Sequence, residues 1–465
     1  MKKEVKIVNE STIFLPKSGK IYKISQRAKE VIEFYVKGFD FESIKEKLKK
    51  YNSKDIEGIY NFIIKLTKEK EKIRHYSNKL FANFNSISML VSERCNLNCR
   101  YCYGEGGSYG VNRNMNFSTA VKIIQWANNI LENNNIKLDK FGVNFFGGEP
   151  LLNFKVIEQT VKYLKSRNFS NLGKPIFSIT TNGVLLNHKI MQFFSKEKFS
   201  IVVSIDGPPE IHDRNRPFKN GKGSHSVIVK NLKMMLDHDI SEYTTLRATV
   251  YPGRGEVKKV VQYLRNLGYK KVQVEYVASN FPERKSEEWC NYAVTKDYGP
   301  IFDEFEKRLK EKRSFIDIVP NNIISYIKSL YYRELKRHFC GISQGFFAID
   351  VNGDIYPCQR FVGVPEWYIG NIQTELNREI LEKFASLSFY KLKICRNCWL
   401  RFFCGGGCSY NNWLINGSIY EPDLLHCAYA KYIFLRIIPL MAEYKEYLTE
   451  VLHLNKMVKV EGEKE

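Results

Sequence analysis

The run Ser92-Glu93-Arg94-Cys95-Asn96-Leu97-Asn98-Cys99-Arg100-Tyr101-Cys102-Tyr103 spaces three cysteines as C-x3-C-x2-C. This spacing folds three thiolates around one small centre. A tetrahedral zinc ion would need a fourth protein ligand, and no other Cys or His stands close by in the sequence. A [4Fe-4S] cube also takes four ligands, so three thiolates leave one iron open to a small molecule. A structural zinc loop is the alternative.

Outward from this run, short apolar stretches alternate with amphipathic ones. The alternation predicts six strands with helices between them, at residues 86–91, 142–146, 175–180, 201–205, 246–251 and 271–276. Ser118 is the expected cap of the first of these helices. The pattern predicts an α/β fold whose parallel sheet forms an incomplete, six-stranded TIM-like barrel. In such barrels the chemistry lies at the carboxyl ends of the strands.

Four polar segments stand at those strand ends or on a strand. They are Gly147-Gly148-Glu149-Pro150, Thr180-Thr181-Asn182-Gly183, Ser204-Ile205-Asp206-Gly207 and Leu246-Arg247-Ala248-Thr249-Val250. Together with the cysteine run they resemble the radical S-adenosylmethionine (SAM) enzymes. In that family the open iron binds the amino and carboxylate groups of SAM. One electron from the cluster then gives a 5'-deoxyadenosyl radical, which abstracts a hydrogen atom from the substrate.

The resemblance implies roles for individual residues. It implies that Cys95, Cys99 and Cys102 hold the SAM-binding cluster, and that Arg247 pairs with the SAM carboxylate through its planar fork. The other implied contacts with SAM come from Gly147, Gly148, Glu149, Thr181, Asn182, Ser204, Asp206 and Tyr101. Glu149 would accept from the SAM ammonium group, and Ser204 or Asp206 would meet its ribose or carboxylate. The alternative for each polar side chain is a strand-end cap, and for Tyr101 it is packing against the cluster.

A second group of cysteines follows the predicted sheet. It reads Cys340-x12-Gly353-x4-Cys358, then Cys395-x2-Cys398-x5-Cys404-x3-Cys408, then Cys427. This resembles the SPASM domain of radical SAM enzymes that modify peptides. The resemblance implies two auxiliary clusters, one held by Cys340, Cys358 and Cys408 and the other by Cys395, Cys398, Cys404 and Cys427. Two zinc sites are the alternative.

Further features of this region follow from the same pattern. The first auxiliary cluster would keep an open iron, which a substrate thiolate, Cys290 or a non-Cys side chain could fill. A buried structural thiol is the simpler interpretation of Cys290. Gly353 predicts a hairpin turn before Cys358. Because regular periodicity is weak here, we expect that something other than a hydrophobic core holds the segment together.

The first 80 residues predict a separate, winged-helix-like module. Strands are expected at 12–15 and 20–24, and helices at 28–35, 41–51 and 55–66, with Ser53 as the cap of the third helix. These residues hold 20 Lys and Arg against 11 Asp and Glu, in a chain of formal net charge +22. A Lys-rich genome or an acidic partner would both explain this surplus.

The remaining boundaries complete the domain organisation. We expect a leader-peptide recognition domain at 1–80, the radical SAM domain at 81–280, a helical bridging region at 281–339, the SPASM domain at 340–430, and a C-terminal helix and tail at 431–465. No signal peptide is evident, and the longest apolar run, 432–441, is interrupted by Arg436 and Pro439. The expected location is therefore the cytoplasm, with no membrane segment.

The combination resembles maturases of ribosomally made peptides, in which an extended leader adds as a strand to the N-terminal module. Here the expected edge is 21–25. The loop Gly104-Glu105-Gly106-Gly107-Ser108-Tyr109-Gly110 resembles the sactipeptide and ranthipeptide synthases, which join a cysteine sulfur to a carbon. The resemblance also implies three [4Fe-4S] clusters, SAM as cofactor, and an electron donor such as ferredoxin or flavodoxin.

Other functions fit the same architecture. The first is a formylglycine-generating sulfatase maturase, although those relatives usually lack the N-terminal module and carry an eighth auxiliary cysteine. Carbon–carbon cross-linking and epimerising maturases are further alternatives within the peptide class. A nucleic-acid binder would use the basic charge, but RNA-modifying relatives carry different C-terminal domains. The sequence leaves the precursor peptide, the acceptor residue, the catalytic base and the oligomeric state undetermined.

Overall fold

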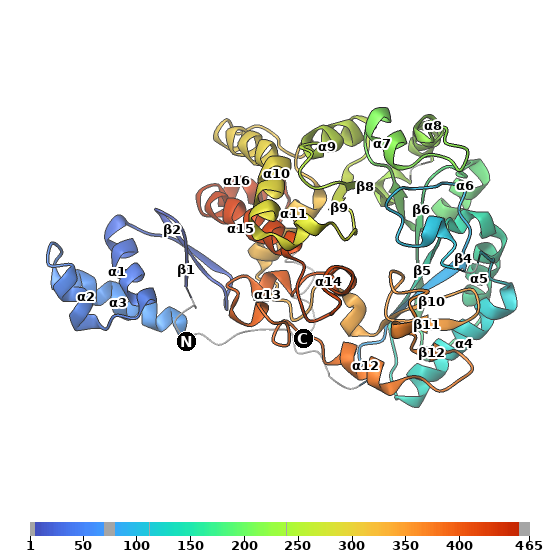
Figure 1. Ribbon diagram of the computed structural model, residues 1–465, viewed down its shortest axis with the longest axis horizontal. Coiled ribbons are helices and arrows are strands. Elements are labelled where there is room, and N and C mark those ends of the chain that lie inside the picture. The colour runs from blue at the N-terminus through green and yellow to red at the C-terminus, as the bar shows by residue number, and fades with distance from the viewer. Residues whose placement is uncertain (1–4, 69–79, 111, 239, 455–465) are drawn as a thin grey trace. The chain divides into compact units, whose positions relative to one another are not determined.

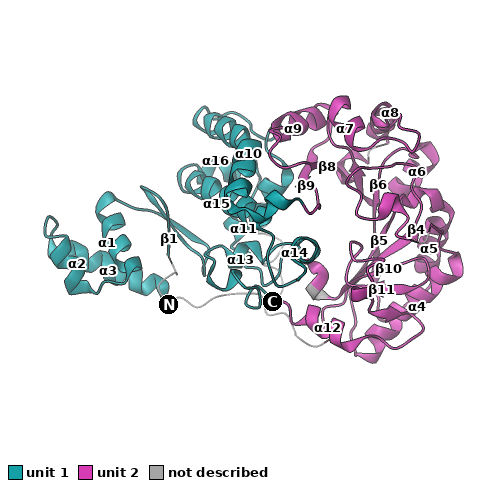
Figure 2. Cartoon of the chain, viewed as in Figure 1, with its two compact units in different colours: residues 1–75, 281–339, 388–465 teal, residues 76–280, 340–387 magenta. Residues whose placement is uncertain are grey.

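The computed structural model describes residues 5–68, 80–110, 112–238 and 240–454 (Figure 1). The chain divides into two compact units (Figure 2). Unit 1 comprises residues 1–75, 281–339 and 388–465, and unit 2 comprises residues 76–280 and 340–387. The expected linker at 69–79 and the tail after residue 454 lie outside the described residues.

Unit 2 is built on a nine-stranded sheet with the order β12-β11-β10-β4-β5-β6-β7-β8-β9. Six neighbouring strands are parallel and follow chain order: β4 Ser86–Ser92, β5 Lys140–Gly147, β6 Lys174–Thr181, β7 Ser200–Ser204, β8 Thr244–Val250 and β9 Lys271–Tyr276. Each predicted strand lies within two residues of an observed one. All six carboxyl ends therefore meet at one edge of the sheet, where the polar segments lie.

Helices connect these strands. They are α4 Phe117–Asn133, α5 Phe154–Ser166, α6 His188–Lys196, α7 Pro209–Asn215, α8 His225–Leu236 and α9 Val257–Asn266. Each long helix buries one apolar face; α5, for example, buries Val156, Ile157, Val161 and Leu164. Such one-sided burial against a sheet is what the helical period of the apolar residues predicts.

The sheet continues into the cysteine-rich segment. Strand β10 Phe346–Ile349 pairs in parallel with β4, and β11 Asp354–Tyr356 returns beside it, followed by β12 Gly370–Asn371. Gly353 takes φ +89° in the hairpin between β10 and β11, as expected of the turn. The pairing of β10 with β4 joins residues more than 250 positions apart, which local sequence patterns do not reveal.

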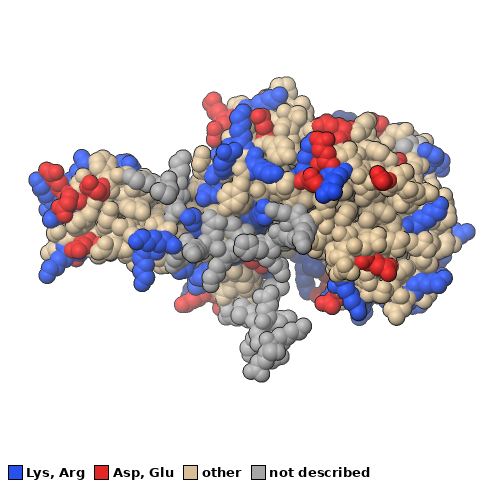
Figure 3. Space-filling view, turned by 90° about the horizontal axis from the view of Figure 1, so that it is seen from below, with Lys and Arg blue, Asp and Glu red and all other residues tan. Residues whose placement is uncertain are grey.

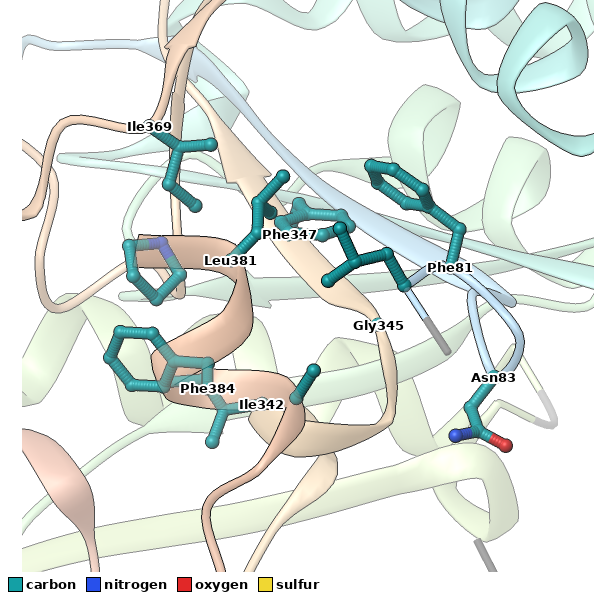
Figure 4. A pocket seen from close by; sticks show the side chains of 11 residues that line it. Phe81, Asn83, Ile342, Gly345, Phe347, Ile369, Leu381 and Phe384 are labelled. Atoms are coloured by element: carbon teal, nitrogen blue, oxygen red, sulfur yellow. The ribbon is translucent and has the colours of Figure 1, made fainter. Parts of the chain in front are cut away.

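Apolar packing holds this part of the segment, and the expectation of a missing hydrophobic core is wrong here. The rings of Phe361, Trp367 and Phe384 lie 5.3–5.9 Å apart between centroids. Phe384 belongs to α12 Arg378–Ala385. A small apolar cavity of about 30 Å³ lies beside α12, lined by Phe81, Phe347 and Leu381 among others (Figure 4). The aromatic side chains, which have no helical or strand period, supply the core.

Unit 1 begins with a three-stranded antiparallel sheet of order β1-β2-β3. Its strands are β1 Lys6–Asn9, β2 Thr12–Leu15 and β3 Lys20–Lys23, and its helices are α1 Gln26–Lys37, α2 Phe41–Lys47 and α3 Ser53–Thr67. Strand β1 was not predicted. One apolar cluster joins Ile13 and Leu15 of β2 to Ile32 of α1 and Ile63 of α3.

The rest of unit 1 is helical. It contains α10 Glu287–Lys310, α11 Asn321–Tyr332, α13 Arg401–Cys404, α14 Ser409–Asn416, α15 Leu424–Glu443 and α16 Lys445–Val451. A fully buried ion pair, Arg284 with Asp423, fixes the start of α15, because Asp423 also accepts from the Leu425 amide. Cys290 is buried on α10 and its thiol donates to the Arg284 carbonyl at 3.4 Å, which is the geometry of a structural thiol.

Helix α15 is longer than the apolar run expected at 432–441. By length and composition it is the one helix in the described part of the chain that could cross a membrane, with mean hydropathy 1.3 over its most apolar window. In the structure, 56% of that window is buried, and α15 contacts α10, α11 and the strands β1, β2 and β3. This is the packing of a core helix.

Two expected helix caps are wrong by one or two residues. Asn52, not Ser53, caps α3 by accepting from the Lys54 amide. Asn116, not Ser118, caps α4 by accepting from the Thr119 amide. In both cases the Asn carbonyl oxygen precedes a Ser that the helix incorporates. Asn and Ser are about equally good caps, so sequence alone does not choose between neighbours.

Candidate functional site

A cavity of about 160 Å³ opens at the carboxyl ends of the parallel strands of unit 2. The three cysteines of the C-x3-C-x2-C run line it, together with residues that end β5, β6, β7, β8 and β9. Seven of the nine expected SAM contacts line the same cavity: Tyr101, Gly147, Gly148, Thr181, Asn182, Ser204 and Arg247. The strand ends thus converge as barrel-type folds predict.

Two of the three cysteine thiols, Cys95 and Cys99, would stay protonated at neutral pH unless a metal is bound. Burial raises the pKa of Cys95 to about 12 and that of Cys99 to about 11. A cysteine binds a metal as the thiolate. These thiols therefore need the positive charge of iron to lose their protons. Among the described residues, no three Cys, His, Asp or Glu side chains converge closely enough for a single metal ion. This soft, three-thiol donor set beside an open cavity fits a cluster with one free iron.

Glycines allow the cysteine loop to approach β5 closely. A Cβ at Gly107, which has φ +88°, would lie 2.6 Å from the Cys95 Cβ and 2.7 Å from the Gly148 Cα. A Cβ at Gly147 would lie 2.1 Å from the Ser92 carbonyl oxygen. The loop after Cys102 therefore packs directly on the Gly-Gly turn, and no larger residue fits between them.

Glu149 is not among the residues that line the cavity, and its contact with the SAM ammonium group stays a prediction. Its carboxylate is fully buried, and both oxygens already accept hydrogen bonds. Oε1 accepts from the Thr181 hydroxyl at 2.7 Å, and Oε2 accepts from the Asn182 amide at 2.7 Å. Burial, which outweighs these bonds, raises the Glu149 pKa to about 7. In this structure the Glu149 carboxylate supports the Thr181-Asn182 turn.

Asn182 connects this turn to the cysteine loop. Its side-chain amide donates to Asn96 Oδ1 at 2.7 Å and lies 3.7 Å from the Cys95 sulfur. Asn182 therefore links Glu149, which its backbone amide contacts, to Asn96 and Cys95, which its side chain contacts. The Asn182 side chain thus lines the cavity and also contacts the Cys95 sulfur.

Asp206 is fully buried and is not among the residues that line the cavity, and its contact with SAM stays a prediction. Its carboxylate accepts from Arg216 Nε at 3.0 Å, from the Tyr101 hydroxyl at 2.5 Å and from the Thr249 amide at 3.0 Å. Arg216, at the end of α7, does line the cavity. Sequence reasoning missed Arg216 because it lies outside the four segments. The acidic Asp206 ten residues earlier was the available signal.

Other side chains that sequence reasoning missed complete the wall. Thr249 and Glu275 come from β8 and β9, and Gln359 and Arg360 follow Cys358 directly. The Arg360 guanidinium lies 5.5 Å from the centre of the Tyr103 ring. Gln359 Oε1 is buried and has no hydrogen-bond partner in the described protein. An orphaned acceptor at a cavity wall is a feature that a bound ligand would satisfy.

The second cysteine group falls into both units. Cys395, Cys398, Cys404 and Cys427 lie together in unit 1, close enough that nearby thiolate charges help to raise the pKa of Cys427, after burial as the main cause. Cys404 Sγ lies 3.4 Å from His426 Nε2. Cys340 and Cys358 belong to unit 2 and Cys408 to unit 1. The four thiols predicted to hold one auxiliary cluster thus lie near one another in unit 1, whereas the three predicted for the other cluster are divided between the units.

Comparison with known proteins now identifies the class. Residues 89–264 match the Radical SAM superfamily, and residues 340–399 match SPASM, an iron-sulfur cluster-binding domain. An uncharacterized protein of Methanocaldococcus jannaschii is 32% identical over 307 residues, which cover 65% of this chain and 94% of that protein. The chain belongs to the radical SAM superfamily and carries a SPASM domain.

Two further relatives have stated activities. A cysteine-type anaerobic sulfatase-maturating enzyme of Clostridium perfringens is 29% identical over 348 residues, 69% of this chain and 88% of that enzyme. The radical SAM cyclopropyl synthase TigE of Paramaledivibacter caminithermalis is 23% identical over 426 residues, 88% of this chain and 82% of that enzyme. The chain is thus similar to SPASM-containing maturases.

A solved structure of native anSMEcpe with bound AdoMet (SAM) shares the fold. Its TM-score is 0.61 at 22% identity, over 79% of this chain and 99% of that one. This confirms the α/β radical SAM fold with its parallel sheet. The cofactors predicted from the sequence, SAM and three [4Fe-4S] clusters, are confirmed for this class of enzyme.

Proposed function

We propose that this enzyme oxidises a cysteine within a peptide segment to formylglycine. One observation carries the proposal: a single cavity of unit 2 is lined both by the C-x3-C-x2-C loop and by Gln359 and Arg360, which directly follow Cys358. A substrate side chain in this cavity would lie beside the radical-generating cluster and next to an auxiliary-cluster ligand. The relatives called cysteine-type sulfatase-maturating enzymes support this choice over a thioether synthase.

The cavity residues take the following roles in the proposal. Cys95, Cys99 and Cys102 hold the SAM-binding cluster, and Arg247 and Ser204 meet the SAM carboxylate and ribose. The Gly147-Gly148 backbone and the Thr181-Asn182 turn hold the methionine end. In place, this cofactor pair supplies one-electron chemistry that removes a hydrogen atom from a substrate carbon.

The proposed reaction balances without an external oxidant. The substrate cysteine loses one hydrogen atom from its β-carbon, then one electron and the thiol proton, which leaves a carbon–sulfur double bond. Water adds, hydrogen sulfide departs, and formylglycine remains. SAM is the oxidant: it ends as methionine and 5'-deoxyadenosine, and the departing electron returns to the clusters. An initial electron comes from a donor such as ferredoxin or flavodoxin, in the cytoplasm.

The chain's own residues direct the peptide and its proton. Glu275, at the end of β9, is the one carboxylate that lines the cavity in the described part of unit 2, and it is our candidate acceptor for the thiol proton. Gln359 Oε1, which lacks a partner, would accept from a peptide N–H. Tyr103 and Arg360, whose ring centre and guanidinium lie 5.5 Å apart, would form the wall against which the peptide lies.

A second candidate function is thioether formation in a ribosomal precursor peptide. The observation that favours it is the N-terminal module of three strands and three helices. The similarity to TigE extends over 88% of this chain, compared with 69% for the sulfatase-maturating enzyme of Clostridium perfringens. Strand β3 lies at the edge of its sheet, so a leader could add along 21–25. Tyr22 on β3 faces Phe62 on α3, with ring centroids 5.8 Å apart, and Phe62 is 46% exposed. This reaction also removes one hydrogen atom, one proton and one electron, but the hydrogen atom comes from the acceptor residue. The cysteine sulfur then bonds to that carbon and stays in the peptide.

Peptide mass spectrometry with anaerobically reconstituted enzyme, SAM and reductant tests the choice. Two substrates are compared: a cysteine-containing sulfatase-type peptide and the Cys-rich peptide encoded beside the gene. Replacement of sulfur by oxygen with loss of two hydrogens supports formylglycine formation. Loss of two hydrogens with a thiol that resists alkylation supports the thioether instead. Modification with every thiol still free contradicts both.

The leader site has its own test. Binding of the leader part of the neighbouring peptide is followed by fluorescence anisotropy for wild type and Phe62→Ala. Loss of the exposed ring should weaken binding about tenfold or more, the effect of removing an aromatic anchor. Tyr292→Ala removes an exposed aromatic side chain of α10, and this control should not weaken binding. Equal affinity for wild type and Phe62→Ala would exclude a leader site at β3 and Phe62.

A further inference from the structure

Arg216 connects the cysteine loop to a buried carboxylate. Its Nε donates to Asp206 Oδ1 at 3.0 Å, and its Nη1 lies 3.9 Å from the Cys99 sulfur, within reach of an N–H···S hydrogen bond. The guanidinium also lies 5.2 Å from the centre of the Tyr101 ring. The side chain is about one-tenth exposed, so water screens these interactions little.

A closed network fixes this arginine from both ends. On one side, Asp206 is held by the Tyr101 hydroxyl and the Thr249 amide. On the other, the Ser224 hydroxyl donates to the Arg216 carbonyl at 2.6 Å and contacts His212 Nε2 at 3.0 Å. His212 Nδ1 in turn accepts from the Asp206 amide at 3.2 Å.

Charge states agree with this geometry. Burial lowers the pKa of His212 to about 4, so its ring is neutral and Nδ1 can accept. Burial alone would also lower the Arg216 pKa, but the charge and hydrogen bond of Asp206, together with the nearby Tyr101 and Cys99, outweigh burial and raise that pKa. The guanidinium therefore stays positive beside Cys99, whereas the Asp206 carboxylate accepts from Arg216 Nε, the Tyr101 hydroxyl and the Thr249 amide.

A positive charge at a ligand sulfur favours the cluster state that carries the extra electron. Hydrogen bonds to the sulfurs and net charge are two determinants of cluster potential, and partners beyond the ligands orient the ligands and tune a metal centre. We propose that Arg216, oriented by Asp206, donates to the Cys99 thiolate and raises the reduction potential of the SAM-binding cluster. Arg216 is thus a positioning residue for SAM reduction. The inference depends only on the assignment of Cys99 as a cluster ligand, not on which peptide is modified.

Redox titration of the reconstituted enzyme without SAM, followed by electron paramagnetic resonance, tests the proposal. A variant with Ala at Cys95, Cys99 and Cys102 supplies the auxiliary-cluster signals to subtract. Arg216→Gln should shift the potential of the remaining cluster to more negative values with unchanged iron content. Arg216→Lys, which keeps the charge, should restore most of the difference.

Two further variants separate the effect of the Arg216 charge from loss of the cluster and from a general effect of removing an arginine. The double variant Asp206→Asn with Arg216→Gln removes both buried charges together. Its reduction potential should shift in the same direction, but by less. If the single variant loses its cluster, the potential is measured on the double variant. Arg214→Gln, on the same helix but paired with Glu256, should leave the potential unchanged. An unchanged potential in Arg216→Gln, or an equal shift in Arg214→Gln, would overturn the proposal. So would weaker SAM binding as the sole effect, which would make Arg216 a SAM ligand only.

Discussion

Gly107 and Gly110 lie three residues apart in the same loop, both with positive φ, yet their surroundings differ. A Cβ at Gly107 would collide with Cys95 and Gly148, whereas nothing lies within 4 Å of a Cβ at Gly110. Alanine at either position would be strained to a similar degree in the left-handed backbone conformation. The difference between them therefore isolates the packing of the loop on the Gly-Gly turn.

We predict that Gly107→Ala loses most iron and sulfide of the SAM-binding cluster and that Gly110→Ala keeps it. Iron analysis and the visible absorption of anaerobically purified protein measure this directly. The auxiliary clusters should survive in both variants, since their ligands lie elsewhere in the sequence. Equal cluster content in the two variants would contradict the close packing described for Gly107.

Asp350 gives a prediction for pH. It is 4% exposed at the β10–β11 turn, and burial raises its pKa to about 6, although the Asn352 and Asp354 amides donate to it. The folded state therefore holds this proton more tightly than the unfolded state, whose value is 3.8. Stability falls as pH rises from about 4 to about 6 and then levels, because ionising the buried group costs free energy.

Asp350→Asn keeps an acceptor oxygen but carries no charge to bury. Its stability relative to wild type should rise through this pH range by up to roughly 2–3 kcal/mol, the value of a shift of about two pKa units. Urea unfolding at pH 4, 5, 6 and 8 measures it. Asp139→Asn, which removes an exposed carboxylate, is the control for the loss of a surface charge. A constant difference for Asp350→Asn would show that burial does not control this group.

Among elements, β2 links the N-terminal module to the loop that carries four cysteines of unit 1. The Phe14 ring on β2 is fully buried, with ring centroids 6.0 Å from Trp399 and 5.6 Å from Phe403. Trp399 directly follows Cys398, and Phe403 directly precedes Cys404. The module is therefore part of the packing that shapes this cysteine loop.

We predict that Phe14→Ala destabilises unit 1 by about 3–5 kcal/mol, the usual cost of deleting a buried ring. Hydrogen exchange should accelerate in 395–404 as well as in β2. Phe62→Ala removes an exposed ring from the same module and should leave exchange in 395–404 unchanged. Faster exchange confined to the first 68 residues would show that the module and the cysteine loop are independent.

The sequence predicted the six parallel strands well because each is a short, buried apolar run that ends in a polar turn. It missed β1 and the parallel pairing of β10 with β4, since a four-residue edge strand and a contact between distant segments leave no local pattern. Within the site, the strand-end residues were found, but their directions were not. Glu149 and Asp206 face into the protein and support other residues, whereas Arg216, Gln359 and Arg360 reach the cavity from loops or helix ends.

For the whole molecule, charge gives less information than the site does. On the face in Figure 3, Lys and Arg side chains are scattered, with Asp and Glu between them, rather than gathered in one stripe. Many are paired with acidic partners, as Lys50 is with Glu30 in the N-terminal module. Recognition of an acidic leader would therefore depend on the groove beside β3 more than on net charge.

The central claim is that chemistry begins with removal of a hydrogen atom from the β-carbon of a substrate cysteine. The most direct measurement uses a peptide whose cysteine carries deuterium at both β-positions, with mass spectrometry of the 5'-deoxyadenosine produced. The account predicts one deuterium in that product for each modified peptide, and none with the enzyme in which Cys95, Cys99 and Cys102 are Ala. Modified peptide accompanied by unlabelled 5'-deoxyadenosine would contradict it, because the hydrogen atom would then come from another residue, as thioether formation requires.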